Sequence, residues 1–240
     1  MTRLLLLADV HANLAALDAV LASLDERVDL VLSAGDQVGL GPWPEEVLDR
    51  LDSLGARCVL GNHDAECISG RPIFQNPQGI ALTWTRHVLP PQKLNALASV
   101  PERQDGEGWT LVHGSLRGPL WEFLLDRPTA GACFDLFEGR LGVHGHTHLQ
   151  GGFVLKNGAI APIEPREEQI PLLPGARYLV NPGSVGAPRD GDPRAGYAIV
   201  DLERGWLRFG RVPYAVEEAV RALRRAGLPP ALGERLQEGR

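Results

Sequence analysis

Residues 141–149 read LGVHGHTHL, a short apolar run that ends in histidines at alternate positions, His144, His146 and His148. This spacing suits an extended segment leaving a strand, where alternate side chains share one face. A buried imidazole needs partners for two ring nitrogens, so three on one face are hard to explain by packing alone. Neutral imidazole is, in contrast, the commonest side-chain ligand of transition metals. The segment therefore favours a metal site over a polar cluster, provided that upstream strands end in matching carboxylates.

The upstream strands do end in such residues. Each expected strand is apolar, as a buried strand should be, and each then delivers polar side chains: Asp9 and His11 after residues 4–8, Asp36 after 30–34, Asn62 and His63 after 57–60, and His113 after 109–112. Helices are expected between the first three strands, over residues 14–24 and 44–54. Successive strand–loop–helix units predict a parallel sheet whose carboxyl ends bring these loops together.

The rest of the chain changes from strand–helix alternation to a strand-rich pattern. Helices are expected over 76–97, divided at Pro90-Pro91, and over 129–138. Later signals predict two hairpins, one around Asn157-Gly158 and one around Arg204-Gly205, and then a helix from Val216 followed by Pro229-Pro230 and a charged tail that is expected to fray. With no internal repeat or linker in the sequence, residues 1–240 are expected to form a single domain.

Composition narrows the class of protein. The 240 residues are 44% hydrophobic and 22% charged with a net charge of −6, so there is no basic footprint for stable nucleic-acid binding. An anionic substrate would need local positive charge. Cys58, Cys67 and Cys133 lack metal-like spacing and are expected to be reduced thiols. The N-terminal apolar run, Leu4 to Ala8, is too short for a secretory core or a membrane span, so a cytoplasmic location without membrane association is expected.

The motifs D-x-H, G-D, G-N-H-D, H-G and G-H-T-H, in this order and each after an apolar run, resemble those of the calcineurin-like metallophosphoesterases. They fall within residues 4–148, and the stretch NPGSVGAPRDGDPRAGYAIV (181–200) is similar to the C-terminal portion of the bacterial and archaeal phosphodiesterase-type branch. The resemblance implies an α/β fold, a two-sheet β-sandwich flanked by helices (αββα).

The resemblance also implies a dinuclear metal centre. Its ligands would be Asp9, His11 and His148 on one metal, Asn62, His113 and His146 on the other, and Asp36 between them. This donor set suits two divalent transition metals, Mn first and Fe, Ni or Zn as alternatives, better than Mg. A hydroxide between the metals would be the nucleophile. His63 would contact the phosphate and assist the leaving group, whereas His144 is expected to bind neither metal.

Several weaker candidates keep two interpretations. Arg117 and Arg189 follow motif loops and would grip phosphate oxygens alongside Asn62, or else be ordinary surface residues. Asp64 would orient His63 or its loop, or cap a helix. Asn13 would cap a helix or lie near the metals.

One departure bears on the substrate. Protein Ser/Thr phosphatases of this superfamily follow G-D with x-V-D-R-G, whereas residues 35–41 here read GDQVGLG, without that Asp and Arg. The expected function is hydrolysis of small phosphodiesters or phosphoanhydrides, with a small phosphorylated substrate that is potentially nucleotide-derived. The alternatives are a cyclic-nucleotide phosphodiesterase, a dinucleoside polyphosphate hydrolase, a Ser/Thr-type protein phosphatase and, from another class, a non-catalytic interaction scaffold. The sequence leaves an oligomer open.

Overall fold

The first of two sheets contains the apolar strands at the start of the chain. The computed structural model describes residues 3–25, 27–70 and 75–240, and in it this sheet has the order β3-β2-β1-β11-β12-β9. The strands are β1 (Arg3–Leu7), β2 (Leu30–Ser33), β3 (Arg57–Cys58), β9 (Ile170–Pro171), β11 (Ala195–Asp201) and β12 (Trp206–Val212). β1, β2 and β3 run parallel, as expected, and β11 pairs with β1 antiparallel.

The second sheet contains the histidine-rich segment and has the order β4-β5-β6-β10-β7-β8. Its strands are β4 (Arg103–Gly106), β5 (Trp109–Val112), β6 (Leu141–Val143), β7 (Gln150–Lys156), β8 (Ala159–Ile163) and β10 (Arg177–Pro182). β5, β6 and β10 are parallel. The two expected hairpins, β7–β8 and β11–β12, are confirmed. β4 was not anticipated because its sequence, RQDG, has no apolar alternation.

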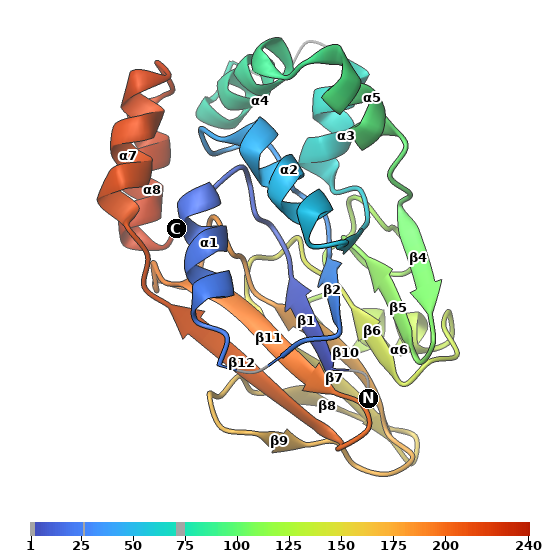
Figure 1. Cartoon of the computed structure of the whole chain (residues 1–240). Coiled ribbons are helices and arrows are strands. Elements are labelled where there is room, and N and C mark those ends of the chain that lie inside the picture. Colours follow the sequence, from blue (N-terminus) through green and yellow to red (C-terminus); the bar gives the residue numbers. More distant parts are fainter. Residues whose placement is uncertain (1–2, 26, 71–74) are drawn as a thin grey trace.

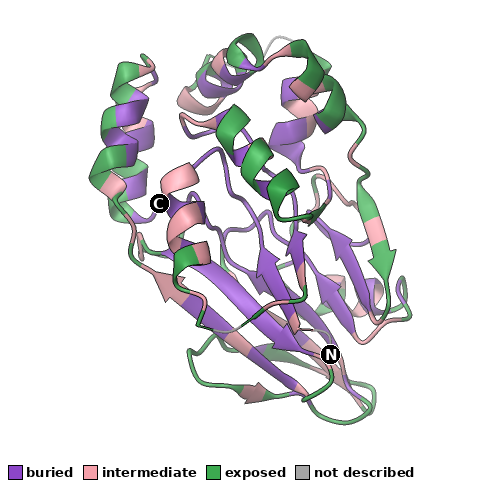
Figure 2. Cartoon of the chain, in the orientation of Figure 1, coloured by how far each residue is buried: buried purple, intermediate pink, exposed green. Residues whose placement is uncertain are grey.

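The two sheets pack face to face, with helices on both outer faces (Figure 1). Alternate leucines of β1 explain this layering. Leu4 and Leu6 contact the core between the sheets, whereas Leu5 and Leu7 pack beneath α1 (Leu14–Ala22) and α2 (Pro44–Ser53). Burial on both faces accounts for the uninterrupted leucine run, and the central strands are buried along nearly all of their length (Figure 2). α6 (Arg127–Phe134) covers the other sheet, which confirms the expected αββα sandwich.

Three further helices lie near the carboxyl ends of the early strands (Figure 1). They are α3 (Asn62–Ser69), α4 (Pro77–Val88) and α5 (Pro91–Ala98), and the boundary between α4 and α5 confirms the expected break at the proline pair. α3 was not anticipated. Its first residue is a candidate ligand, Asn62, and the helix starts there because the Asp64 carboxylate accepts the Gly61 N–H in a capping interaction.

The expectation of a fraying C-terminal tail is wrong. After α7 (Val216–Arg225) the chain forms a further helix, α8 (Pro230–Glu238), with proline at its first position. Leu232 and Leu236, one helical turn apart, are buried against α7 and Leu40. The physical reason is tertiary: two leucines on a short charged helix carry little signal alone, but they find apolar partners in the folded chain. α7 and α8 form a helical hairpin beside α1 (Figure 1).

Two expectations from composition can be compared with the described residues. All three cysteines are unpaired, and burial raises the pKa of the Cys58 and Cys67 thiols to about 12, which keeps them uncharged. No helix in residues 3–25, 27–70 and 75–240 has the length and apolar character required to cross a membrane.

Candidate metal centre

Strand ends deliver the candidate ligands in an uncommon backbone conformation. Seven non-glycine residues in the described chain have positive φ, and five of them are candidate ligands: Asp9 (52°), His11 (49°), Asp36 (51°), His146 (68°) and His148 (60°). The left-handed region costs an L-residue about 1–3 kcal/mol and persists only where the surroundings enforce it. The His11 N–H donates to the Asp36 carbonyl at 2.8 Å, which joins the first two loops. Strain of this kind concentrates at functional sites.

The segment NPGS (181–184), which starts at the end of β10, supports loops from both sheets. The Ser184 hydroxyl donates to the Asp9 carbonyl at 2.7 Å. The Asn181 amide donates to the Gly145 carbonyl at 2.8 Å and to the Thr147 hydroxyl at 3.0 Å. These bonds fix the loops that carry the candidate ligands on β1 and β6.

One group of ligands surrounds His11. Its Nε2 lies 3.2 Å from Nε2 of His148 and 3.5 Å from Oδ2 of Asp36, and Nε2 of His148 lies 3.5 Å from Oδ1 of Asp9. Ligand atoms of these four buried residues all lie within 4.8 Å of one another. The spacing is compact enough for one ion to contact all four.

The other group surrounds His113. Its Nε2 lies 3.0 Å from Oδ1 of Asn62, 3.0 Å from Nδ1 of His146 and 3.6 Å from Oδ2 of Asp36. Oδ2 of Asp36 is therefore nearly equidistant from His11 and His113. A carboxylate in that place can bridge two ions.

The imidazole rings are oriented as metal ligands usually are. In each ring one nitrogen faces a backbone carbonyl, which can only accept a hydrogen bond, so that nitrogen must carry the proton. The pairs are His11 Nδ1 with Val38 O (3.3 Å), His113 Nδ1 with Ala34 O (2.8 Å), His146 Nε2 with Trp121 O (3.3 Å), and His148 Nδ1 with Ala187 O. The other nitrogen then presents its lone pair to the centre. Carbonyl contacts of this kind fix tautomers in metal sites.

This arrangement fits two divalent cations better than a self-sufficient polar cluster. Facing lone pairs 3.0–3.2 Å apart cannot hydrogen-bond to each other in these tautomers. Burial raises the pKa of Asp36 to about 8, and burial together with Asp36 raises the pKa of Asp9 well above its usual range. Burial lowers the pKa of His113 and of His146 to about 4. Cations between these groups would stabilise the ionised carboxylates and bind the free lone pairs.

His63 adjoins both groups and belongs to neither. Its backbone N–H donates to Oδ1 of Asp36 at 2.9 Å, and its ring meets the His11 ring edge-on with centroids 4.7 Å apart. Burial, followed by the charge of Arg189, lowers the pKa of His63 to about 3, so the ring is neutral at pH 7. Its Nδ1 is buried without a hydrogen-bond partner among the described residues. His144 likewise stands apart, with its Nδ1 3.5 Å from the Asn181 amide.

Gly39 lies against the His63 ring and was not singled out as a site residue. A Cβ at Gly39 would lie 2.8 Å from Nδ1 of His63, and the backbone there has φ +126°. Gly39 occupies the place of the missing Asp in the protein phosphatase motif. The sequence signal was thus present, as a departure from that pattern.

The Gly39 contact gives an expected result. Gly39→Ala should displace the His63 ring, and if His63 assists phosphoester hydrolysis, as the resemblance implies, kcat should fall by about 100-fold, since misplacing a reacting group by about 1 Å has that effect. Bound metal should be unchanged in elemental analysis. Gly55→Ala is the matched control, because Gly55 also has positive φ (+60°) but nothing within 4 Å of a Cβ. Equal loss of kcat in both variants would show that backbone strain, rather than the His63 contact, is responsible.

The side chains of Asp64 and Asn13 form hydrogen bonds with backbone groups of nearby loops and helices. The Asp64 carboxylate accepts N–H bonds from Gly61 and Val38 at 3.0 Å, so it organises the loops beside His63 and caps α3. The Asn13 side chain accepts the Ala16 N–H at 3.2 Å, which confirms the helix-cap interpretation, and it also donates to a loop carbonyl, that of Gly186.

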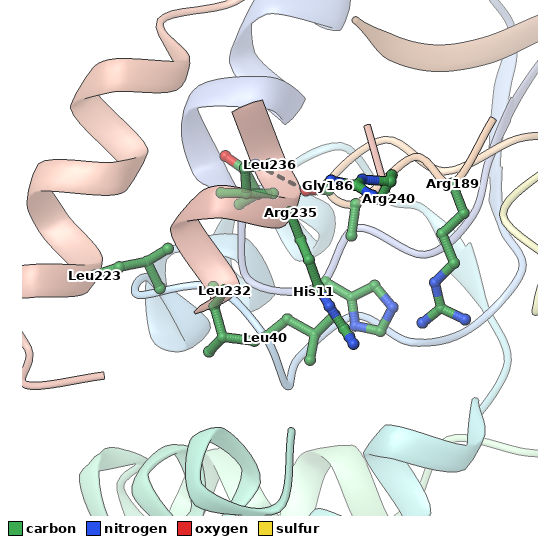
Figure 3. A pocket seen from close by; sticks show the side chains of 12 residues that line it. His11, Leu40, Gly186, Arg189, Leu223, Leu232, Arg235, Leu236 and Arg240 are labelled. Carbon is green, nitrogen blue, oxygen red and sulfur yellow. Dashed lines mark hydrogen bonds between the residues drawn. The ribbon is translucent and has the colours of Figure 1, made fainter. Parts of the chain in front are cut away.

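The two candidate arginines differ in position. The Arg117 guanidinium is exposed and pairs with Glu122 on its own loop, and no described contact joins it to the ligands. Arg189 lines a recess together with His11 (Figure 3). Burial raises the pKa of Asp9 and of Asp36, and the charge of Arg189 partly offsets that rise. The structure therefore brings Arg189, and not Arg117, to the candidate centre.

The Arg117 loop contributes an aromatic wall that the sequence did not indicate. The Phe123 ring stacks on His146 with centroids 4.2 Å apart and planes inclined by 12°. Phe123 and Trp121 are 49% and 56% exposed, so this wall is open to solvent beside a candidate ligand.

Sequence comparison agrees with this geometry. Residues 2–205 match the sequence model of the calcineurin-like phosphoesterase superfamily domain. The chain belongs to this superfamily. It is 32% identical, over 249 residues, to the uncharacterized protein MJ0912 of Methanocaldococcus jannaschii, covering 98% of this chain and 97% of that protein.

Solved structures of the superfamily share the fold over the whole chain. A metallophosphoesterase from Sphaerobacter thermophilus superposes with a TM-score of 0.88 at 40% identity, covering 100% of this chain and 99% of that one. The hypothetical protein PH1004 from Pyrococcus horikoshii has a TM-score of 0.81 at 20% identity, again covering 100% and 99%, and shows the fold alone. Membership of this family and a cluster of candidate metal ligands are thus established together.

Proposed function

We propose that this protein is a dinuclear metal-dependent phosphoesterase that hydrolyses small phosphodiesters or phosphoanhydrides. The observation that carries the proposal is the position of Asp36, whose Oδ2 lies 3.5 Å from His11 Nε2 and 3.6 Å from His113 Nε2. Mn is the expected metal, with Fe, Ni or Zn as alternatives, because imidazole nitrogens and carboxylate oxygens suit these ions. Two bound cations would neutralise phosphate charge and make water between them acidic enough to ionise near neutral pH.

The chain's own residues would then orient the substrate and move a proton. Asn62 and Arg189 lie beside the centre and would bind phosphate oxygens, Arg189 through its forked donors. His63 packs its Nδ1 against Gly39, which leaves Nε2 as the atom to meet the substrate. A neutral imidazole protonated at Nε2 would donate to the leaving oxygen and stabilise the charge that develops there. Burial of the ring excludes water from this bond.

His63→Ala tests the proposal directly. The expected result is a fall in kcat of about 1000-fold on aryl phosphodiesters or phosphoanhydrides, in the range for loss of a general acid. Bound metal should remain stoichiometric because His63 belongs to neither ligand group. His87→Ala provides the matched control, since His87 is exposed on α4. The measurement is a matrix of substrates (aryl phosphomonoester, aryl phosphodiester, phosphoanhydride, phosphopeptide) against Mn, Ni, Fe and Zn. No hydrolysis anywhere in this matrix would contradict the proposal.

The same matrix separates the rivals. Gly39 and Leu40 stand where protein Ser/Thr phosphatases have Asp and Arg, which argues against preference for a phosphopeptide. A putative diadenosine tetraphosphatase shares this fold at 16% identity with a TM-score of 0.55, so a dinucleoside polyphosphate belongs among the phosphoanhydrides tested. An interaction scaffold would be indicated by purified protein that neither retains metal nor hydrolyses any substrate.

A further inference from the structure

A recess opens beside His11 and extends under the C-terminal hairpin (Figure 3). Its walls enclose about 20 Å³ of space for the centre of a water molecule, and the rest of the recess is open to solvent. Four leucines line it, Leu40, Leu223, Leu232 and Leu236. Three arginines also line it, Arg189, Arg235 and Arg240. We call this space the arginine recess. It is continuous with the candidate metal centre, because His11 belongs to both.

The arginine recess carries two guanidinium groups that have no direct ion pair among the described residues. Neither the Arg189 nor the Arg235 guanidinium forms an ion pair or hydrogen bond with any residue in the described ranges. Partial burial lowers the pKa of Arg189, the charges of Asp9 and Asp36 raise it, and the charge of Arg235 lowers it, so Arg189 is attracted to the carboxylates of the candidate centre and repelled by Arg235. Arg240 is different, because its guanidinium pairs with Glu238. Arg189 and Arg235 are both exposed, so water solvates their charges, and an anion between them would accept charge-assisted hydrogen bonds from both guanidinium groups.

The side chains of Arg189 and Arg235 come from different parts of the fold and converge. Arg189 follows the NPGS segment, whereas Arg235 extends from α8. Both side chains extend toward the His11 imidazole (Figure 3). An anion between them would therefore lie next to a phosphate bound at the metal centre.

The hairpin that completes the arginine recess follows the residues that match the superfamily model. The family match ends at residue 205, and α7 and α8 span Val216–Arg225 and Pro230–Glu238. The hairpin is fixed by apolar packing of Leu223, Leu232 and Leu236 on Leu40 and Ala187. Leu40 occupies the place of the missing phosphatase Arg, so positive charge is supplied here from Arg189 and α8 instead.

We propose that the arginine recess binds a second phosphate of the substrate, so that the preferred substrates are phosphoanhydrides, such as nucleoside diphosphates or longer polyphosphates. This inference rests on the proposed function and specifies the substrate class of the same site. Water would add its oxygen to the phosphorus at the metal centre, and the bond from that phosphorus to the bridging oxygen would break. The leaving phosphate keeps that electron pair and takes up one of the water's two protons, while the other is released to solvent. Arg189 and Arg235 would stabilise the charge on the leaving phosphate.

Binding of two non-hydrolysable probes to the metal-loaded full chain tests this inference. Methylenediphosphonate presents two anionic groups and methylphosphonate presents one, and calorimetry measures the affinity of each. Arg235→Gln is expected to weaken methylenediphosphonate binding by about tenfold or more, the effect of one charge-assisted hydrogen bond. Methylphosphonate binding should change by less than about twofold. Arg235→Lys keeps the positive charge but not the forked pair of donors, and it should weaken methylenediphosphonate binding by about threefold.

Arg224→Gln is the matched control, because Arg224 is an exposed arginine of α7 that does not line the arginine recess. It should leave both affinities unchanged. An equal loss for both probes in Arg235→Gln, or no loss for either, would overturn the inference. The two proposals fail separately: probe binding that depends on Arg235 without hydrolysis of any substrate contradicts only the proposed function. If Arg235→Gln hydrolyses a diphosphate and a single-phosphate diester as well as the parent chain does, only the proposal for the arginine recess is contradicted.

Discussion

Asp36→Asn is expected to lower phosphoesterase activity by about 10⁴-fold or more and to remove at least one of the two bound metals. Oδ2 of Asp36 lies 3.5 Å from Nε2 of His11 and 3.6 Å from Nε2 of His113, which are the inward-facing nitrogens of the two ligand groups. The amide keeps the shape and the acceptor that binds the His63 N–H, but it supplies no negative charge between two cations. Without paired cations, water is not ionised near neutral pH. Elemental analysis and kcat with saturating Mn measure the two effects.

In the metal-free protein, Asp36→Asn should increase thermal stability above about pH 5. Burial raises the pKa of Asp36 from its usual 3.8 to about 8, so the folded state binds a proton that the unfolded state releases above pH 4. The stability that this protonated carboxyl contributes is complete below pH 4 and is lost as pH rises to about 8. Asn has no proton to lose. After removal of metal, Asp36→Asn should gain thermal stability relative to the parent chain as pH rises from 5 to 8.

The control for Asp36→Asn is Asp201→Asn. Asp201 is a buried carboxylate remote from the candidate centre, and it accepts the Arg204 backbone N–H. It should retain full metal content and kcat. Asp36→Asn protein that still holds two metals per chain would contradict the bridging position.

The expected strand ends were the most reliable part of the sequence interpretation. Four apolar runs, each followed by Asp, Asn or His, predicted the loops that the structure brings together at one end of both sheets. The reason is local: burial on both faces demands continuous apolar residues, and parallel strands place their carboxyl ends at one edge.

What the sequence did not predict depends on contacts between distant segments. α8 is stabilised by leucines that pack on Leu40 and Ala187, residues nearly 200 and about 45 positions away along the chain. The left-handed backbone at Asp9 and His11 is enforced by hydrogen bonds from two other loops. The inward-facing nitrogen of each histidine is set by a carbonyl on another segment. None of these features leaves a periodic or compositional trace, so Arg235 could not be placed beside Arg189.

Metal removal is expected to lower the thermal midpoint by about 10 °C or more at pH 8, because ligands that bind only the folded state stabilise it by about 3–4 kcal/mol each at 100–1000 times Kd. The decrease in thermal midpoint on metal removal should be smaller at pH 6. Asp36, with a pKa of about 8, and Asp9, also raised, must release protons before cations can bind. The histidines do not limit binding in this window, since burial lowers the pKa of His113 and of His146 to about 4.

The pH dependence of this stabilisation distinguishes carboxylate ligands from a site built on imidazole alone. If histidines of ordinary pKa were the only ligands, the metal-induced shift would be constant above about pH 7. Carboxylates with raised pKa values instead require the shift to keep growing between pH 6 and 8. Differential scanning calorimetry of Mn-loaded and chelated protein at pH 6, 7 and 8 measures it, with Asp36→Asn as the variant in which the growth should be reduced. A shift independent of pH would mean that Asp9 and Asp36 do not bind the cations, and the dinuclear centre would then have no bridge.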